Sequence, residues 1–445
     1  MNPVYVVHCV DAEGPLFESL EATFERVEKL FGIRLTPDRA TLLALQRQEL
    51  DLGGREAAVA DCVSPKRLAF LSTWDQIDTA MQEVLDPSFR GRIKDSFGRP
   101  YVLNWFCLDS VGFEDNPRRK ALGYHVVYRY YRDQVARSGC ERDGLCWHYH
   151  GVPFSHAAHF FGTNWSYTNH HLQILTRRVI DLGSWPAVYR PGGNIERPDI
   201  NLWLEQWIPF DYGNQAMEPE DEHQQPDFQE GRLSDWRRAT REWEVYHPSL
   251  YDYQVKGTLN RWIARCLNLD SRLGSLSQRE VDKAFDRARA GLPTLLGVTN
   301  HDDRDMRGEI AKCYDLLKTA EQRTGVPFRL CNAVEGMRLV LNLPPKAPVR
   351  FSLSWKGSVL TVEADTDVWG AQPFLAIRTH EARYLHDNWA YHGGRRWSYT
   401  FDEMSVPLEA VSQIGIAAND AYGNTTVVQH DPRSGATAHR YLNGS

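Results

Sequence analysis

The amino-acid sequence predicts an α/β protein in which a parallel sheet covered by helices precedes a small all-β sandwich. Between residue 4 and about residue 342, short β-branched apolar runs alternate with longer amphipathic segments. The stretch NLPPKAPV at 342–349 then interrupts this alternation, because two adjacent prolines cannot continue a helix. Beyond it, short apolar runs are separated by Gly, Asn and Asp turns. We therefore expect one domain at 1–343, with its sheet open or closed into a barrel, and a β-sandwich at 344–445.

The expected elements of the first half follow from these patterns in chain order. VYVVHCV at 4–10 is a continuous apolar run too short for a helix, so it predicts a buried strand. The amphipathic segment 122–139 predicts a helix that ends near Gly139, followed by the strand LCWHYH at 145–150. A further helix is expected over 169–183, and it leads to the strand PAVY at 186–189.

The second half contains the clearest helix boundaries. Ser277 and Glu280 have the spacing of a capping box, and Gly291 with Pro293 supplies a stop, which predicts a helix over 277–291. A strand is expected at 294–301 and a helix at 308–322. The strands of the sandwich are expected within 349–366, 373–379, 395–408 and 414–430.

Composition excludes several classes of protein. The chain has 51 Lys and Arg residues against 58 Asp and Glu, a net charge of −7, so no nucleic-acid partner is expected. No window reaches the roughly 18 uninterrupted apolar residues of a membrane span. The N-terminus lacks the basic region of a secretion signal, and the eight cysteines form no CxxC pair. We expect a cytoplasmic protein with reduced, mostly buried thiols. The acidic segment 215–232 is expected to be a solvated loop rather than an active-site lid.

Polar residues that could carry chemistry follow the predicted strands, at the edge where parallel folds build their sites. Asp11 and Glu13 follow the first strand and precede a Gly-Pro turn, so they could serve as a general base and a metal ligand. The alternative is a turn aspartate with an exposed glutamate. His301 ends the strand expected at 294–301, and Asp302 follows it. An imidazole beside a carboxylate suits acid–base chemistry, although turn formation is an equal alternative.

A histidine cluster follows the strand at 145–150. WHYHGVPFSHAAH at 147–159 holds four histidines, and imidazole is a common ligand of transition metals. His148 and His150 would project from the same face of a strand. The alternative is a set of surface or core histidines. For His170 and His171, inside a predicted helix, the structural interpretation is favoured.

Two further motifs are ambiguous in isolation. Arg190 ends the strand PAVY before two glycines, where it could orient a carboxylate and lower its pKa or could be a surface residue. The segment WIPFDYGN at 207–214 contains Asp211 and Tyr212 among aromatic residues that could stack on a sugar or belong to the core.

In order and spacing, these motifs resemble the polysaccharide deacetylase family, the carbohydrate esterase family 4-like hydrolases. The matching segments, which span most of residues 4–310, are VDAEGP, WHYHGVPFSHAAH, YRPGG, WIPFDY and TLLGVTNHD. The resemblance implies an irregular (β/α) barrel of the deacetylase type that holds one divalent metal, with zinc (Zn²⁺) the expected ion. It also implies that the metal is bound by one acid and two histidines.

The resemblance assigns Asp11 as general base, Glu13 and His148 as metal ligands, His301 as general acid and Arg190 as the residue that orients Asp11. The chain has Asp-Ala-Glu where the family has adjacent aspartates, so Asp11 and Glu13 could exchange roles. The family's pair of histidines four residues apart is also missing, so the second histidine ligand is His150 or, as second choice, His156. The residues expected to contact substrate are Trp147, Trp165, Asp211, Tyr212 and Asp302.

These assignments predict a metal-dependent hydrolase that removes an N-acetyl or N-formyl group from an amino sugar. The implied setting is the biosynthesis of a bacterial surface polysaccharide such as O-antigen. One alternative is a glycoside hydrolase on a similar barrel that uses Asp11 or Glu13 together with Asp211. The other is a glycan-binding protein that has lost catalysis.

Overall fold

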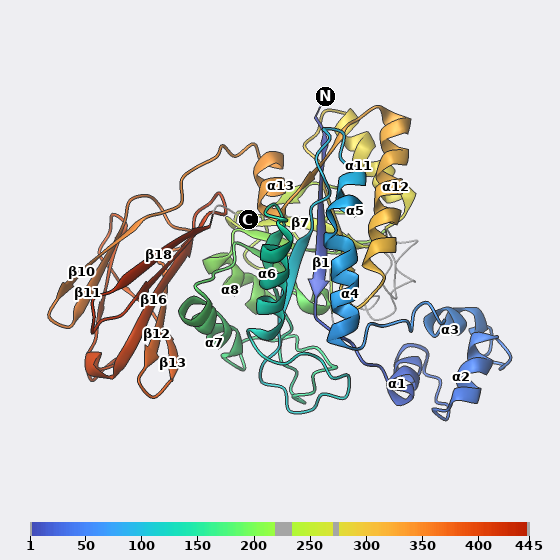
Figure 1. The fold of residues 1–445 in the computed structure, drawn as a ribbon, viewed down its shortest axis with the longest axis horizontal. Helices are drawn as coiled ribbons and strands as arrows, with labels where there is room; N and C mark the ends of the chain where they lie inside the picture. The colour runs from blue at the N-terminus through green and yellow to red at the C-terminus, as the bar shows by residue number, and fades with distance from the viewer. Residues whose placement is uncertain (1, 219–233, 270–275, 443–445) are drawn as a thin grey trace.

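The computed structural model describes residues 2–218, 234–269 and 276–442, so most of the predicted acidic loop at 215–232 lies outside the described residues. Parallel strands close into a seven-stranded barrel at the centre of the first domain (Figure 1). The prediction of a parallel sheet is therefore confirmed. The strands of the barrel are, in order, β1 (Val4–Ala12), β2 (Asn104–Asp109), β3 (Gly144–Tyr149), β4 (Val188–Pro191), β5 (Phe210–Asn214), β7 (Trp262–Asn268) and β8 (Leu295–His301).

Strand β1 closes the barrel because it pairs with other strands along both of its edges. Residues 5–11 of β1 pair with β8, and residues 9–12 pair with β2. The beginning of β1 pairs with a further parallel strand, β9 (Phe328–Cys331). Asn104 on β2 links β1 to the segment that follows β9, since its side-chain amide donates to the carbonyl of His8 at 3.0 Å and accepts from the Ala333 amide at 2.6 Å. A short strand, β6 (Val245–Tyr246), runs antiparallel to β7.

Helices cover the outer face of the barrel. Apolar side chains of α4, α6, α11 and α12 pack with the strands in one large buried cluster. By contrast, α1–α3 form a small apolar cluster of their own beyond the end of β1 (Figure 1). The helix bounds are α1 (Leu20–Phe31), α2 (Arg39–Gln46), α3 (Glu56–Cys62), α4 (Trp74–Leu85), α5 (Pro87–Arg92), α6 (Val126–Ser138), α7 (His170–Arg177), α8 (Pro198–Trp207), α11 (Gln278–Arg289), α12 (Met306–Thr324) and α13 (Ala333–Val340).

The predicted helices are present, but some of their boundaries differ. Helix α6 begins at Val126 rather than at residue 122, and α12 extends two residues beyond the predicted 308–322 at each end. Helix α6 ends at Gly139, which adopts a left-handed conformation as expected. Ser277 caps α11, but Glu280 does not complete the capping box, because its carboxylate accepts instead from the buried guanidinium of Arg265. The helix predicted over 169–183 ends in a π-helical turn at Arg178–Leu182. Two carbonyl groups of this turn accept hydrogen bonds from the Gln429 side chain, a contact made only by the folded chain.

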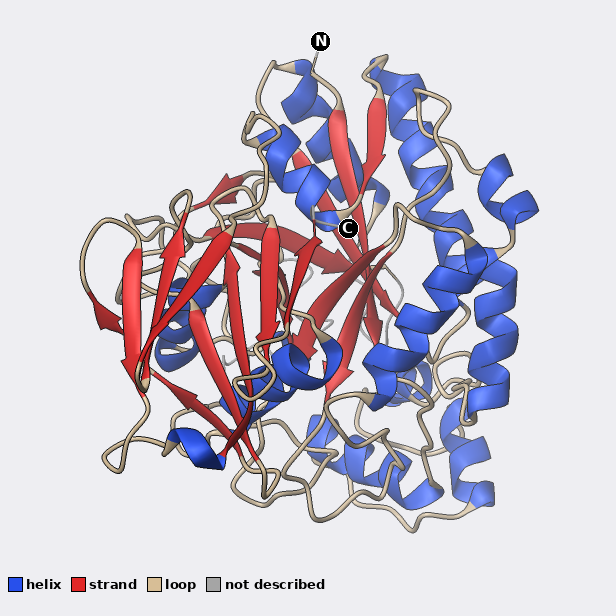
Figure 2. Ribbon diagram, turned by 60° about the vertical axis from the view of Figure 1, so that its left-hand side comes forward, coloured by secondary structure: helices blue, strands red, loops and turns tan. Residues whose placement is uncertain are grey.

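Two antiparallel sheets follow the proline-rich segment (Figure 2). Residues from both sheets contribute to one buried apolar cluster. All four segments predicted to contain strands do so, whereas β13, β14 and β18 were not predicted. The four-stranded sheet contains β10 (Phe351–Lys356), β11 (Val359–Ala364), β15 (Arg396–Thr400) and β14 (Ala390–Tyr391), and the five-stranded sheet contains β13 (Tyr384–Asp387), β12 (Phe374–Thr379), β16 (Val411–Asn419), β17 (Thr425–His430) and β18 (Thr437–Leu442).

The five-stranded sheet packs directly on the barrel domain. Phe374 on β12 is fully buried, with its ring 4.6 Å from that of Trp185 and 5.3 Å from that of Trp207. The Asn419 side chain donates to the carbonyl groups of Pro186 and Trp207 at 2.8 and 2.9 Å. The two parts of the chain therefore share a buried apolar cluster, and each depends on the other for its burial.

Two other features agree with the composition. All eight cysteines are free thiols, and six of them are buried. Among the described residues, none of the helices combines the length and the apolar character needed to cross a membrane.

Phe374→Ala should destabilise the protein by about 3 to 5 kcal/mol, because it opens a cavity between the barrel and the five-stranded sheet. Chemical denaturation would measure the change. Phe97→Ala is the matched control, since Phe97 is 55% exposed and its loss should change stability by less than about 0.5 kcal/mol. Equal stability of the two variants would contradict a shared core.

His171 supplies a test of how burial affects stability at acid pH. Its ring lies 5.3 Å from that of Trp165 and 5.0 Å from that of Trp203, and burial lowers its pKa to about 4. An unfolded histidine titrates near pH 6.5. Between these values the unfolded chain binds the additional proton, so the free energy of unfolding falls as the pH falls.

His171→Phe should remove this contribution to the pH dependence. We expect the stability of the variant relative to wild type to increase steadily from about pH 6.5 to about pH 4. Urea denaturation at several pH values would measure it. A constant difference across this range would show that His171 does not lose a proton on folding.

Candidate metal centre

The end of β1 places two carboxylates at one edge of the barrel. Asp11 is buried on β1 and lies in register with His301 on β8. Glu13 follows the strand in a turn that Asp302 stabilises, because its carboxylate accepts from the backbone amides of Glu13 at 3.0 Å and Gly14 at 2.7 Å. Gly14 adopts a positive φ of 78°. This turn orients the Glu13 side chain toward the end of β3.

The end of β3 supplies two histidines to the same edge. His148 and His150 are buried and alternate with Tyr149, so both project toward Glu13, as the strand periodicity predicted. His150 lies against the turn after β4. A Cβ atom on Gly192 would come within 2.1 Å of His150 Cδ2, so only glycine leaves room for this imidazole.

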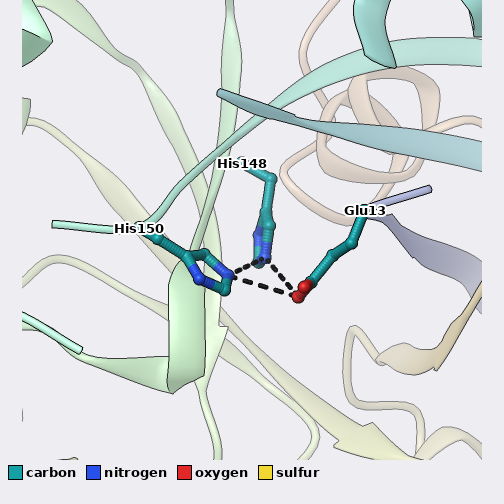
Figure 3. Close-up of side chains that lie close together, drawn as sticks. All are labelled: Glu13, His148 and His150. Carbon is teal, nitrogen blue, oxygen red and sulfur yellow. Dashed lines mark hydrogen bonds and ion pairs between the residues drawn. The ribbon is translucent and has the colours of Figure 1, made fainter. Parts of the chain in front are cut away.

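Glu13, His148 and His150 form a group whose potential ligand atoms lie within 4.8 Å of one another (Figure 3). Glu13 Oε1 is 3.2 Å from His150 Nε2 and 3.7 Å from His148 Nε2. The two Nε2 atoms are 3.2 Å apart. One carboxylate oxygen and two imidazole nitrogens thus converge from two strands that are neither adjacent in sequence nor paired in the sheet.

The hydrogen bonds and charges around these three side chains favour the binding of a cation. His148 Nδ1 lies 3.0 Å from the carbonyl oxygen of Arg190, which can only accept, so Nδ1 carries the proton and Nε2 keeps its lone pair. Burial lowers the pKa of His150 to about 4, so its imidazole is neutral at neutral pH. Burial raises the pKa of Glu13, but the positive charge of Lys120 opposes burial, and that pKa lies well below its usual range. Two imidazoles and one carboxylate are a donor set that suits zinc and related divalent ions.

Asp11 lies beside this group and is fixed by Arg190. The Arg190 Nε atom donates to both carboxylate oxygens of Asp11, at 2.8 and 3.1 Å. The other guanidinium nitrogens donate to the Tyr212 carbonyl at 3.0 Å and to Asn194 Oδ1 at 2.8 Å. Burial raises the pKa of Asp11, but the positive charge of Arg190 outweighs it, so the pKa is lowered overall. Asp11 is therefore a fixed, ionised carboxylate.

His301 lies on the other side of Asp11. Its Nε2 is 3.9 Å from Asp11 Oδ2, while His148 Nδ1 is 3.8 Å from Asp11 Oδ1. The His301 side chain is 29% exposed, unlike the almost fully buried His148 and His150. Of the residues around Asp11, His301 is thus the one best placed to exchange a proton with a molecule outside the protein.

The structure places the other candidate ligands elsewhere. His156 lies outside the group, since its Nδ1 is 2.8 Å from the Gly112 carbonyl oxygen and its backbone has a positive φ of 54°. Between the two candidates for the second histidine, the geometry brings only His150 to Glu13 and His148. His159 packs against Phe160, with ring centroids 4.1 Å apart.

The residues expected to contact substrate are buried and make internal contacts. Trp147 and Trp165 belong to an apolar core cluster. The Tyr212 hydroxyl donates to the Ala333 carbonyl at 2.6 Å. Asp211 is fully buried in an ion pair with Arg261, and Asp302 holds the turn at Glu13. These side chains shape the barrel end from within rather than face an incoming molecule.

Sequence reasoning missed three residues around the centre. Asp109 ends β2 and accepts from Trp147 Nε1 and Arg178 Nη2, both at 2.9 Å, and burial raises its pKa to about 7. The strand-end rule that selected the other motifs could have identified it. Asn194 directly follows the Arg-Pro-Gly-Gly motif and could also have been identified as a candidate from its position. Lys120, whose Nζ is 3.0 Å from Glu13 Oε2, lies in a loop with no local pattern that marks it.

Comparison with known proteins adds no assignment. No protein-family model matches the chain, and a search of curated proteins finds no match. The resemblance to polysaccharide deacetylases therefore depends on the sequence motifs and stays a prediction.

Gly192→Ala should lower the amount of metal that copurifies with the protein, because the added methyl group displaces His150. We expect at least about a tenfold loss of zinc affinity, as is typical when a residue that orients a ligand is disturbed. Elemental analysis and competition with a chromophoric chelator would measure it. Gly91→Ala is the control, since no atom lies within 4 Å of a Cβ built there. Wild-type zinc affinity in Gly192→Ala would exclude His150 as a ligand.

Proposed function

We propose that the protein is a metal-dependent hydrolase that removes an N-acetyl or N-formyl group from an amino sugar during surface-polysaccharide assembly. The proposal depends on one observation: two carboxylates lie at the same site but have different partners. Glu13 points at the imidazoles of His148 and His150, whereas Asp11 lies beside that group and is held by Arg190. A hydrolase that uses a metal and a separate general base needs this division.

Glu13, His148 and His150 would hold one divalent metal, for which zinc is our proposal. Such an ion, when bound, lowers the pKa of a water molecule and polarises an acyl carbonyl group. Asp11 would accept the proton of the attacking water, since Arg190 keeps its carboxylate ionised and oriented. As the carbon–nitrogen bond of the amide breaks, His301 would donate a proton to the departing amine.

The architecture of the barrel supports this assignment. A closed parallel barrel with its candidate site at the carboxyl ends of β1, β3, β4 and β8 is compatible with the deacetylase type. We include in the proposal that the two C-terminal sheets form the β-sandwich expected from the sequence. The substrate would be an N-acylated amino sugar or glycan.

The glycoside hydrolase alternative has weaker support. It requires two carboxylates that face the scissile bond, and Asp211 was the expected partner of Asp11 or Glu13. Asp211 is fully buried, and its Oδ2 is bound to Arg261. Burial and a neighbouring carboxylate, Glu196, raise the pKa of Asp211 although Arg261 opposes this shift. A group in this position cannot reach a sugar.

Release of acetate or formate from a panel of N-acetylated and N-formylated amino sugars, free and nucleotide-linked, tests the function. We expect activity that a chelator removes and Zn²⁺ restores. Release of reducing sugar that survives chelation would support the glycosidase instead. Glycan binding with substoichiometric metal and no hydrolysis would support the non-catalytic alternative.

Asp11→Asn should keep bound zinc but reduce turnover by about 10²-fold or more, since the amide cannot accept the proton of water. His148→Ala should lose both metal and turnover. Elemental analysis and the acyl-release assay measure the two properties on the same samples. Loss of zinc in Asp11→Asn would make Asp11 a ligand, and full metal in His148→Ala would show that the ligand set is wrong.

A further inference from the structure

The two carboxylate oxygens of Glu13 face different partners. Oε1 is the oxygen directed at the imidazoles of His148 and His150. Oε2 accepts a hydrogen bond from the Lys120 ammonium group at 3.0 Å. The pair is well shielded from solvent, because the Lys120 and Glu13 side chains are only 8% and 16% exposed. One oxygen of the carboxylate is therefore already committed to a cation of the protein.

Lys120 reaches this position from a loop whose shape is fixed at several points. Two backbone hydrogen bonds between Ser110 and Gly123, at 3.2 and 2.6 Å, close the base of the loop. The Asn116 side chain holds the Lys120 backbone from both sides, accepting from its amide and donating to its carbonyl, each at 2.9 Å. Arg119, the residue before Lys120, adopts a positive φ of 52°. These contacts fix the shape of the loop and thereby the position of the Lys120 ammonium group.

The same loop connects the segments that follow β1 and β3. The Phe17 amide, beyond Glu13, donates to the Arg118 carbonyl at 3.1 Å. The Glu114 amide donates to the carbonyl of His156, beyond His150, at 2.8 Å. Lys120 thus lies between the strand ends that supply the carboxylate and the imidazoles.

We propose that Lys120 is a positioning residue of the metal centre that confines Glu13 to ligation through Oε1 alone. The proposal rests on the metal binding in the proposed function and adds to it a residue that sets the number of ligand atoms. A carboxylate can bind a metal with one oxygen or with both. With Oε2 held by Lys120, Glu13, His148 and His150 offer three protein atoms, which leaves room for water and substrate as in catalytic zinc sites.

A second consequence is electrostatic. The ammonium group binds the carboxylate that would also hold a metal, so its positive charge opposes the binding of a divalent cation. Removing this charge, and thereby freeing Oε2, should strengthen metal binding while increasing the number of ligand atoms. A lysine that served only to stabilise the loop would have the opposite effect, because its loss would disorder the site and weaken metal binding.

The experiment uses the full-length protein loaded with Co²⁺, whose visible absorption reports coordination number, together with Zn²⁺ competition against a chromophoric chelator. Lys120→Met should bind Zn²⁺ about tenfold more tightly than wild type. Its Co²⁺ complex should absorb less strongly, as expected for a higher coordination number. Lys120→Arg retains the positive donor and should restore the wild-type spectrum. Lys120→Gln, which is polar and uncharged, serves as a second neutral variant.

Lys256→Met is the matched control, since it removes a lysine that pairs with Glu244 at 2.6 Å, outside the metal-ligand group. Its spectrum and Zn²⁺ affinity should be those of wild type. Unchanged or weaker Zn²⁺ binding in both Lys120→Met and Lys120→Gln would overturn the proposal. Wild-type protein that binds neither Co²⁺ nor Zn²⁺ would instead refute the metal centre itself, and the role of Lys120 with it.

Discussion

The buried ion pair between Arg190 and Asp11 is the interaction on which the candidate site depends. A buried carboxylate such as Asp11 loses its hydration, and only a well-aligned positive partner compensates for that loss. Arg190 provides this partner and uses its other donors on Tyr212 and Asn194. Its backbone carbonyl also orients His148. One residue on β4 therefore fixes both the proposed base and one proposed ligand.

The charged side chains of the whole centre are also paired with partners of opposite charge. Two carboxylates, Asp11 and Glu13, are matched by two cations, Arg190 and Lys120, while His150 is held neutral by burial. A divalent ion would then bring net positive charge to the site. Such a charge favours the negative charge that develops on an acyl oxygen during amide hydrolysis. The arrangement is consistent with hydrolysis at a metal and gives less support to chemistry between two free carboxylates.

Much of the local structure could be predicted because it depends on short-range patterns. The strand at 4–10, the end of α6 at Gly139 and the cap at Ser277 follow from apolar periodicity, glycine conformation and side-chain capping. The placement of His148 and His150 on one face follows from the two-residue period of a strand. Several elements lacked a prediction, among them helices α1–α5, α8 and α13 and strands β2, β5, β7 and β9. The end of the helix at 169–183 differed because Gln429 reaches it only in the folded chain.

The sequence by itself determined which residues end β1, β3, β4 and β8, and hence that Asp11, Glu13, His148, Arg190 and His301 could meet at one edge. Only the tertiary structure decided the choice of His150 over His156, the burial of Asp211 and Trp147, and the contact of Lys120 with Glu13. The physical reason is that these interactions act over different separations along the chain. Strand periodicity is a property of adjacent residues, whereas burial and ion pairing depend on distances across the barrel that no local pattern encodes.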